Sequence, residues 1–373
     1  MKKLNKSAPI RAMKLVGALT LAAVMAFAPP AQACTSFLLA TSDHGFIYGR
    51  TMEFAFPLQS KVVVMPRNFA MQATGPDGKP GRTWQSKYAS VGMNALGLQV
   101  LIDGMNEKGL AGGMLYFPGY AGYTDAAAAD PAKAMASWEF LSFALSQFAT
   151  VGEVKAALND VQITGIANQE LGFTPPLHYT LHDASGASIV IEPIDGKLKV
   201  YDNPFGVMTN APTFDWHLTN LKNYVKLSPV DAPALTIGGQ TITSFGEGSG
   251  LLGIPGDATP PSRFIRALGY VISAQKLPGG DQSVRLAEHI LNNFDIPTGW
   301  IRETAKQAAD KPLEFTQWST IADLTNRRFF VKTYDDQVLR GIDLMSFDLD
   351  AKTIRSVTVA ATPTPPALVF PAP

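Results

Sequence analysis

Cysteine is nearly absent from this sequence of 373 residues, which contains a single one, Cys34. A lone cysteine cannot form a disulfide within its own chain, so this side chain serves another purpose. Charge of one sign is lacking too, since 31 basic residues are balanced by 31 acidic residues. Because binding of nucleic acid requires an excess of positive charge on one face, we expect no nucleic-acid partner.

Histidine is also scarce, with five residues scattered along the chain. No two of them lie close together beside a carboxylate in the way that zinc ligands usually do. We therefore expect no metal and no other cofactor. Hydrophobic residues make up 46% of the chain and charged residues 17%, the usual composition of a folded globular protein with a sizeable core.

The chain has no long hydrophobic run, and its most apolar stretch lies near the start. Lysines and arginines precede residues Leu15 to Ala28, and this stretch is too short to span a bilayer comfortably. Ala31-Gln32-Ala33 then matches the A-x-A pattern of a signal-peptide cleavage site. We predict that residues 1–33 are a cleaved signal peptide and that the product is periplasmic or secreted, without a stable membrane anchor. The alternative is an uncleaved anchor.

Cleavage after Ala33 would make Cys34 the first residue of the mature chain. One interpretation is a lipidated cysteine, although Ala31 stands where lipoprotein sites usually have a leucine-like residue. The other is a free terminal cysteine, which carries a nucleophile and a base in one residue. Its α-amine has a pKa of about 7.7–8.0 and its thiol one of about 8.5, so the amine accepts the thiol proton near neutral pH.

Strand patterns and helix patterns alternate in blocks along residues 34–361. Runs at 34–40 and 46–52 predict a hairpin, and a further strand is expected at 97–102. Helices are expected at 134–148 and from Ser262, as N-cap, to residue 274. No linker divides these blocks, which favours one layered α+β domain, followed by a flexible Pro-rich tail at 362–373.

The hairpin brings Arg50 and Glu53 back toward Cys34. A guanidinium beside the sulfur favours the thiolate, but an exposed ion pair between Arg50 and Glu53 is an equal alternative. Asn210 follows a predicted strand at 207–209, where its amide would suit an oxyanion. The alternative for Asn210 is a turn residue before Pro212.

At these residues the sequence resembles the choloylglycine hydrolase family, which includes bile salt hydrolases and penicillin V acylases. Six motifs in order carry the resemblance: Cys34-Thr35-Ser36-Phe37, Tyr48-Gly49-Arg50-Thr51-Met52-Glu53, Gly104-Met105-Asn106-Glu107-Lys108-Gly109-Leu110, Tyr116-Phe117-Pro118-Gly119-Tyr120, Asn203-Pro204-Phe205-Gly206-Val207-Met208-Thr209-Asn210, and Pro255-Gly256-Asp257 with Ser262-Arg263-Phe264. The resemblance implies a four-layer αββα sandwich of the N-terminal-nucleophile hydrolase type.

The resemblance also implies roles for individual residues. Cys34 would be nucleophile and base, Arg50 would stabilise the thiolate, and Arg263 would complete the charged cluster. Asn210 would donate to the oxyanion, with a backbone N–H near Tyr116 as the second donor. Glu53 stands where many members have aspartate, which contacts the terminal amine.

The substrate implied by the resemblance is a small linear amide with a bulky apolar acyl group. Bile salt hydrolases often have asparagine where this chain has Tyr116, and some penicillin acylases have tyrosine. Alternatives are an N-acyl homoserine lactone or fatty-amide acylase and, in another class, a lipidated periplasmic binding protein. The expected assembly is a homotetramer.

Overall fold

The computed structural model describes residues 33–302, 313–361 and 367–370. Two antiparallel sheets dominate it, one of five strands in the order β1-β2-β16-β17-β18 and one of eight in the order β13-β12-β11-β8-β7-β6-β3-β19. The smaller sheet consists of β1 (Cys34–Ala40), β2 (Phe46–Phe54), β16 (Phe315–Asp323), β17 (Arg328–Thr333) and β18 (Arg340–Asp343). The larger consists of β3 (Val62–Met65), β6 (Ser90–Met93), β7 (Asp103–Asn106), β8 (Ala111–Tyr116), β11 (Leu177–His182), β12 (Ser188–Ile194), β13 (Lys197–Asp202) and β19 (Arg355–Val357).

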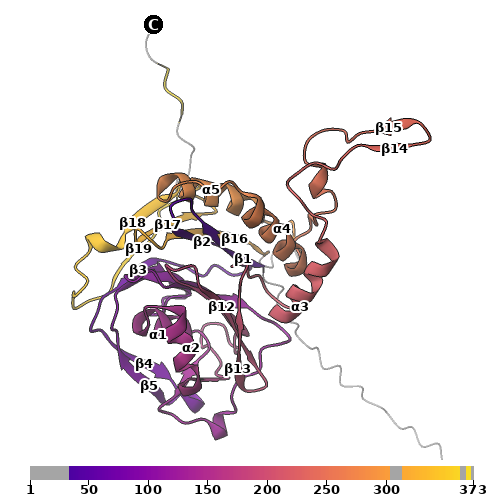
Figure 1. Ribbon diagram of the computed structural model, residues 1–373. Coiled ribbons are helices and arrows are strands. Elements are labelled where there is room, and N and C mark those ends of the chain that lie inside the picture. The colour runs from indigo at the N-terminus through magenta and orange to yellow at the C-terminus, as the bar shows by residue number, and fades with distance from the viewer. Residues whose placement is uncertain (1–32, 303–312, 362–366, 371–373) are drawn as a thin grey trace, which may run out of the picture. The chain divides into compact units, whose positions relative to one another are not determined.

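Helices cover the outer faces of these sheets (Figure 1). Helices α4 (Pro260–Ser273) and α5 (Asp281–Leu291) pack on β1, β2 and β16, while α1 (Phe140–Gln147) packs on β7 and β8. Helices α2 (Val151–Ala157) and α3 (Phe214–Asn220) complete the set among the described residues. The predicted four-layer αββα sandwich is confirmed.

Three two-stranded ribbons complete the described structure. They are β4 (Ala70–Thr74) with β5 (Pro80–Gln85), β9 (Ala134–Ala136) with β10 (Gln162–Thr164), and β14 (Leu235–Ile237) with β15 (Gln240–Ile242). The β14–β15 ribbon stands away from the sheets in Figure 1. No helix among the described residues is long and apolar enough to cross a membrane.

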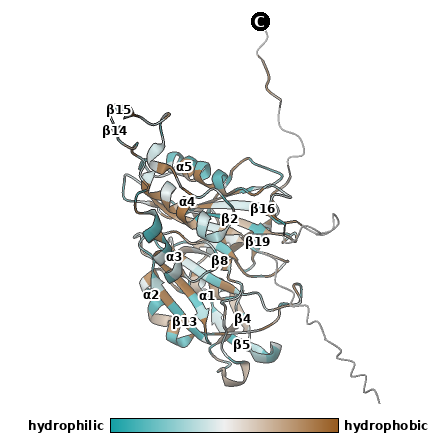
Figure 2. Cartoon of the chain, turned by 90° about the vertical axis from the view of Figure 1, so that its right-hand side faces the viewer, coloured by the Kyte–Doolittle hydropathy of each residue, from teal (hydrophilic) through white to brown (hydrophobic). Residues whose placement is uncertain are grey.

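The core lies between the two sheets and beneath the helices. Phe37, Ile47 and Tyr48 of the first hairpin are fully buried, as are Phe264 of α4 and Ala287 of α5. Both α4 and α5 mix hydrophobic and hydrophilic residues along their length in Figure 2, as helices with one buried face do.

The structure corrects four sequence-based expectations. Residues 97–102 are not a strand, because Gly97 has a positive φ of 70° and the strand begins only at Asp103. The predicted helix at 134–148 opens instead as β9, which pairs with β10 before α1 starts. Residues 207–209 form only one bridge, between Met208 and Ser36.

The fourth correction concerns the start of α4. Thr259 is the N-cap residue, followed by two prolines, and Ser262 already lies inside the helix. Proline suits the first turn of a helix because its missing N–H needs no partner there. The Ser262 hydroxyl donates to Asp257 at 2.6 Å.

Two expectations fall largely outside the described residues. The predicted signal peptide, residues 1–33, is described only at Ala33, and the predicted tail, residues 362–373, only at 367–370, which are exposed.

Candidate active site

The first hairpin brings Cys34 and Arg50 together. In its register Cys34 is opposite Met52 and Ser36 is opposite Arg50, so these four side chains share one face. Nη2 of Arg50 lies 3.7 Å from Sγ of Cys34, and both side chains are almost completely buried. The predicted proximity of the guanidinium and the sulfur is therefore present.

Arg50 is fixed by groups of the neighbouring sheet. Its Nη2 donates to the Met114 carbonyl at 2.6 Å and its Nη1 to the Ile102 carbonyl at 2.8 Å. Nη1 also lies 3.6 Å from Oδ1 of Asp103, a fully buried carboxylate. The alternative of an exposed ion pair between Arg50 and Glu53 is wrong, because Arg50 is buried and pairs with Asp103.

The side chain of Asn210 lies against the backbone nitrogen of Cys34. Its Oδ1 accepts from Cys34 N and from Nη2 of Arg263, each at 2.7 Å, and its Nδ2 donates to the Tyr116 carbonyl at 2.8 Å. Two donors on the oxygen and a carbonyl on the nitrogen fix the orientation of this amide. One hydrogen of Nδ2 remains for another acceptor.

Arg263 ties the start of β1 to α4. Its Nη1 donates to the Cys34 carbonyl and to Oγ1 of Thr35, and its Nε donates to the Ala258 carbonyl. From the sequence, only the family resemblance placed Arg263 in the site. The structure shows that it holds both Cys34 and Asn210.

Glu53 lies on the other face of the hairpin from the Cys34 side chain, because it is one residue beyond Met52. Thr316 donates to its Oε1 at 2.8 Å, and its Oε2 is buried without a hydrogen-bond partner among the described residues. Burial raises the pKa of Glu53 to about 8, although Arg263 acts in the opposite direction.

A second carboxylate in this region, Glu314, was missed from the sequence. It is buried, and its Oε1 accepts from the backbone nitrogen of Ala33 at 2.5 Å. Its charge contributes to raising the pKa of Glu53. Glu314 lies 280 positions beyond Cys34 (314 − 34), and no local pattern in the sequence connects the two. Asp103 was also missed from the sequence. It directly follows residues 97–102, which were wrongly predicted to be a strand.

Burial raises the pKa of the Cys34 thiol. The positive charge and the hydrogen bond of Arg50 act against this effect, as does a hydrogen bond from the Glu53 backbone. The thiol therefore needs a base close by to ionise at neutral pH.

Cys34 and Arg50 open onto a narrow pocket of about 70 Å³ with an almost entirely apolar wall. Its lining includes Met52, Phe54, Leu58, Leu96, Met114, Tyr116, Trp138, Leu171 and Leu177. The Tyr116 hydroxyl is buried without a hydrogen-bond partner among the described residues. The pocket is suited to an apolar group.

The family of linear amide C–N hydrolases, choloylglycine hydrolase family, matches residues 34–357 of this chain. The chain belongs to this family. It is a hydrolase of linear amide bonds, and it has the sandwich fold and the cysteine at the start of β1 that the resemblance implied.

Relatives in the choloylglycine hydrolase family cover most of this chain. A bile salt hydrolase/transferase of Clostridium perfringens is 35% identical over 327 residues, 87% of this chain and 96% of the relative. A penicillin V acylase of Pectobacterium atrosepticum is 29% identical, over 90% of this chain and 87% of the relative.

Solved structures of the family superimpose well on this fold. A mutant conjugated bile acid hydrolase from Clostridium perfringens has a TM-score of 0.77 at 33% identity, covering 88% of this chain and 97% of its own. A penicillin V acylase from Agrobacterium tumefaciens has a TM-score of 0.70 at 25% identity, covering 88% and 92%.

Proposed function

We propose that the mature enzyme begins at Cys34 after removal of residues 1–33 and acts in the periplasm or outside the cell. Two observations support this: Ala31-Gln32-Ala33 has the pattern of a cleavage site, and the family match begins at residue 34. Removal of Ala33 converts the Cys34 amide nitrogen, which cannot act as a base, into an amine.

The observation that carries the mechanism is the contact between Arg50 and the Cys34 sulfur at the mouth of an apolar pocket. The terminal amine takes the thiol proton, and the thiolate attacks the carbonyl carbon of the amide. The C–N bond then breaks as the ammonium returns its proton to the leaving amine. Water hydrolyses the resulting thioester and restores the thiol.

The oxyanion of the tetrahedral intermediate lies against Asn210. Its Nδ2 has one hydrogen left after its bond to the Tyr116 carbonyl, and a pre-oriented donor of this kind stabilises developing negative charge. The Phe117 N–H already donates to the Pro176 carbonyl, so the N–H of Tyr116 is the second donor that we propose. Glu53 and Arg263 hold the terminal amine and the start of β1.

The substrate class that we propose is an amide with an apolar acyl group, such as penicillin V or a conjugated bile acid. Relatives named for each of these activities cover most of the chain. The narrow pocket and the unpartnered Tyr116 hydroxyl favour a flat acyl group with an oxygen close to the carbonyl, as in phenoxyacetyl, over a steroid. N-acyl homoserine lactones and fatty amides have linear acyl chains that also suit this pocket.

We also propose a homotetramer. Large apolar side chains are exposed around the β14–β15 ribbon, among them Val230, Leu235, Ile237, Ile242 and Phe245. Exposed apolar groups concentrated on one projecting segment are typical of a contact between subunits. Light scattering, which measures the molar mass of the assembly, tests this on the intact chain and on a chain lacking residues 235–242. We expect the mass of four chains for the intact protein and of fewer than four for the shortened one.

The deciding experiment combines N-terminal sequencing, intact mass and kinetics. We expect a terminal Cys-Thr-Ser-Phe, a mass without lipid, and hydrolysis of penicillin V. A chain that keeps Ala33 should fold but not turn over. Full activity with Ala33 in place would contradict the terminal-amine mechanism, and a blocked, lipid-bearing Cys34 would contradict the free terminal cysteine on which it depends.

A further inference from the structure

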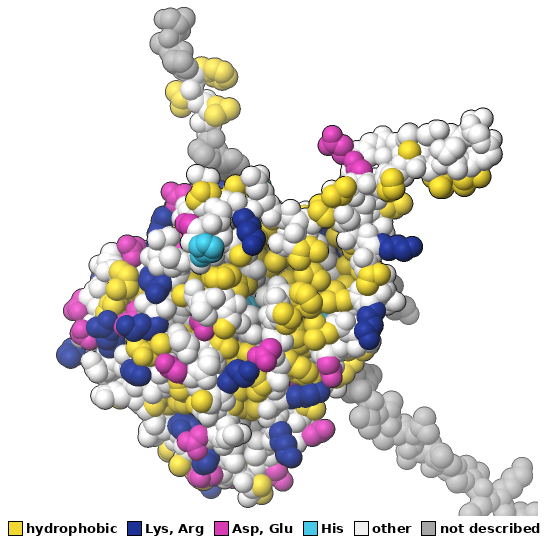
Figure 3. All heavy atoms as spheres, in the orientation of Figure 1, with side chains coloured by type: hydrophobic (Ala, Val, Ile, Leu, Met, Phe, Trp, Pro, Cys, Tyr) yellow, Lys and Arg dark blue, Asp and Glu magenta, His cyan; other side chains and the backbone are white. Residues whose placement is uncertain are grey.

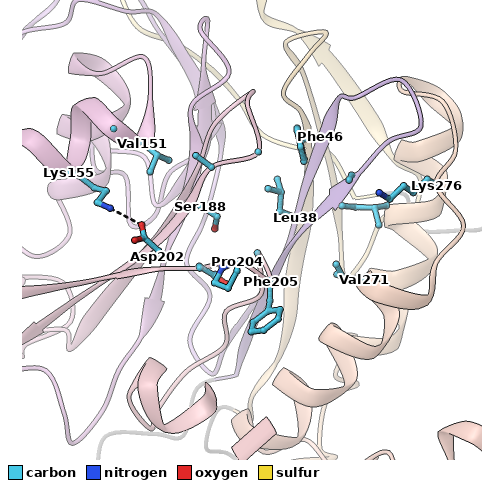
Figure 4. Close-up of a pocket in the computed structure, with 17 residues that line it drawn as sticks. Leu38, Phe46, Val151, Lys155, Ser188, Asp202, Pro204, Phe205, Val271 and Lys276 are labelled. Carbon is cyan, nitrogen blue, oxygen red and sulfur yellow. Dashed lines mark hydrogen bonds and ion pairs between the residues drawn. The ribbon is translucent and has the colours of Figure 1, made fainter. Parts of the chain in front are cut away.

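A groove of about 560 Å³ lies apart from the Cys34 pocket and shares no lining residue with it. Figure 4 shows its lining side chains on two sides, with Lys155, Asp202 and Ser188 facing Val271 and Lys276. Leu38 and Phe46 of the first hairpin lie between them. Its volume is in the range of small-molecule binding sites.

Most of the wall of this groove is apolar, with polar side chains at its edges. Leu38 is buried, and Phe46, Phe205 and Val271 are half-buried, so each still has surface to cover. Hydrophobic side chains gather over α4 and the elements beneath it on the face shown in Figure 3. An apolar body of a ligand would cover this surface.

Two residues that line the groove each have a buried polar atom without a hydrogen-bond partner among the described residues. These atoms are Oγ of Ser188 and Oδ1 of Asn203, whose residues are 8% and 3% exposed. The Asn203 N–H donates to the Ser188 carbonyl at 2.9 Å, so the two residues are neighbours across β12 and the end of β13. A hydroxyl group accepts from a serine and donates to an amide oxygen, and would satisfy both atoms.

The groove also carries one uncompensated positive charge. Lys155 is neutralised by Asp202 at 2.8 Å, whereas Lys276 is exposed and makes no ion pair with any described residue. An anionic group is therefore the complement to this end of the groove.

We propose that this groove is a second binding site, for a small amphipathic anion that carries a hydroxyl group. Its carboxylate or sulfonate pairs with Lys276, its apolar body covers Leu38, Phe46 and Val271, and its hydroxyl bonds with Ser188 and Asn203. The site is independent of the chemistry proposed at Cys34.

The groove adjoins segments that lead to the candidate active site. Leu38 belongs to β1, which begins at Cys34. Nδ2 of Asn203 donates to the Val207 carbonyl at 3.0 Å, within the segment that ends at Asn210. An occupant of the groove would therefore contact β1 and lie beside the segment that ends at Asn210.

The test is calorimetric titration with 10-hydroxydecanoate and with decanoate. The protein carries Cys34→Ala to prevent turnover and Leu171→Trp to fill the acyl pocket, so that only the groove is measured. We expect one bound 10-hydroxydecanoate, with decanoate about tenfold weaker because it leaves Ser188 and Asn203 unpaired.

Substitutions of the groove and of a distant lysine complete the design. Lys276→Glu should weaken binding at least about tenfold by replacing attraction with repulsion, and Ala187→Trp should abolish it by filling the groove. Lys352→Glu, which makes the same charge change outside the groove, should leave the affinity unchanged. Absence of binding in the starting protein, or equal binding by the Lys276 and Lys352 variants, would overturn the proposal.

Discussion

A buried sulfur is a poor acid, and the side chain that offsets this for Cys34 is Arg50. The guanidinium of Arg50 contacts the sulfur only because two backbone carbonyls and Asp103 hold it in place. A planar fork of donors serves all these partners at once, which a lysine ammonium cannot do.

The first prediction follows from this geometry. Arg50→Lys should lower kcat/KM by about a hundredfold or more, since the charge remains but the hydrogen bonds that aim it are lost. Arg263→Lys should also lower it, because Arg263 holds both Cys34 and Asn210. Steady-state kinetics with penicillin V on both variants checks this. A loss below threefold in Arg50→Lys would show that the contact with the sulfur does not matter.

The second prediction concerns Tyr116 and substrate choice. Tyr116→Asn should shift the ratio of kcat/KM for glycocholate over penicillin V toward glycocholate, by about tenfold. The smaller side chain widens the pocket and removes the hydroxyl that we propose contacts the phenoxyacetyl oxygen. Tyr116→Phe is the matched control, which removes only the hydroxyl and should weaken penicillin V alone. An unchanged ratio in Tyr116→Asn would show that Tyr116 does not determine which substrate is preferred.

At the scale of elements, the first hairpin is packed too tightly to accept an extra methyl group. Phe37 is opposite Gly49 in the register, and a Cβ on Gly49 would lie 2.6 Å from the Phe37 ring. Gly49 thus leaves room for a buried aromatic ring in the strand pair that bears the nucleophile.

The third prediction is that Gly49→Ala destabilises the protein by about 1–3 kcal/mol, because overpacking forces the ring or the strand to move. Gly152→Ala in α2 is the control, since the added Cβ would lie an ordinary 3.8 Å from Oγ1 of Thr150. That change should be neutral or stabilising by up to about 1 kcal/mol. Urea unfolding of both variants measures the difference, and equal stabilities would contradict the argument.

At the scale of the whole molecule, the stability of the unprocessed chain depends on the ionisation of Glu53. Burial raises the pKa of this carboxyl to about 8, against 4.5 for an ordinary glutamate. Below pH 4.5 both the folded and the unfolded chain hold this proton. Between pH 4.5 and about 8 the unfolded chain releases it and the folded chain keeps it, so stability falls as pH rises.

The fourth prediction is that Glu53→Gln removes this dependence. In a chain that keeps Ala33, the variant should gain stability over the parent as pH rises from 5 to 8, by roughly 1–4 kcal/mol in all. The gain should be smaller in the processed chain, where the ammonium of Cys34 favours the ionised Glu53. Urea unfolding at several pH values checks this, and parallel curves for parent and variant would contradict it.

The sequence by itself indicated the chemistry and the fold class through local features. A single cysteine placed directly after a cleavage pattern, and six ordered motifs, led to Cys34, Arg50, Asn210 and Arg263. These residues could be predicted because each motif, and each strand with alternating burial, occupies a short continuous stretch of the chain. The hairpin register that joins Cys34 and Arg50 follows from such a stretch.

The tertiary structure decided what depends on contacts between distant segments. Asp103 and Glu314 became part of the site only when β7 and β16 were placed beside the first hairpin, and residues 134–136 formed a strand only because β10 offers a partner. The burial of Glu53 on the face of the hairpin opposite the Cys34 side chain, and the groove beside Asn203, likewise result from packing between distant segments. Burial, pairing and cavities are properties of surfaces brought together by folding, and periodicity along one segment does not encode which surface will meet it.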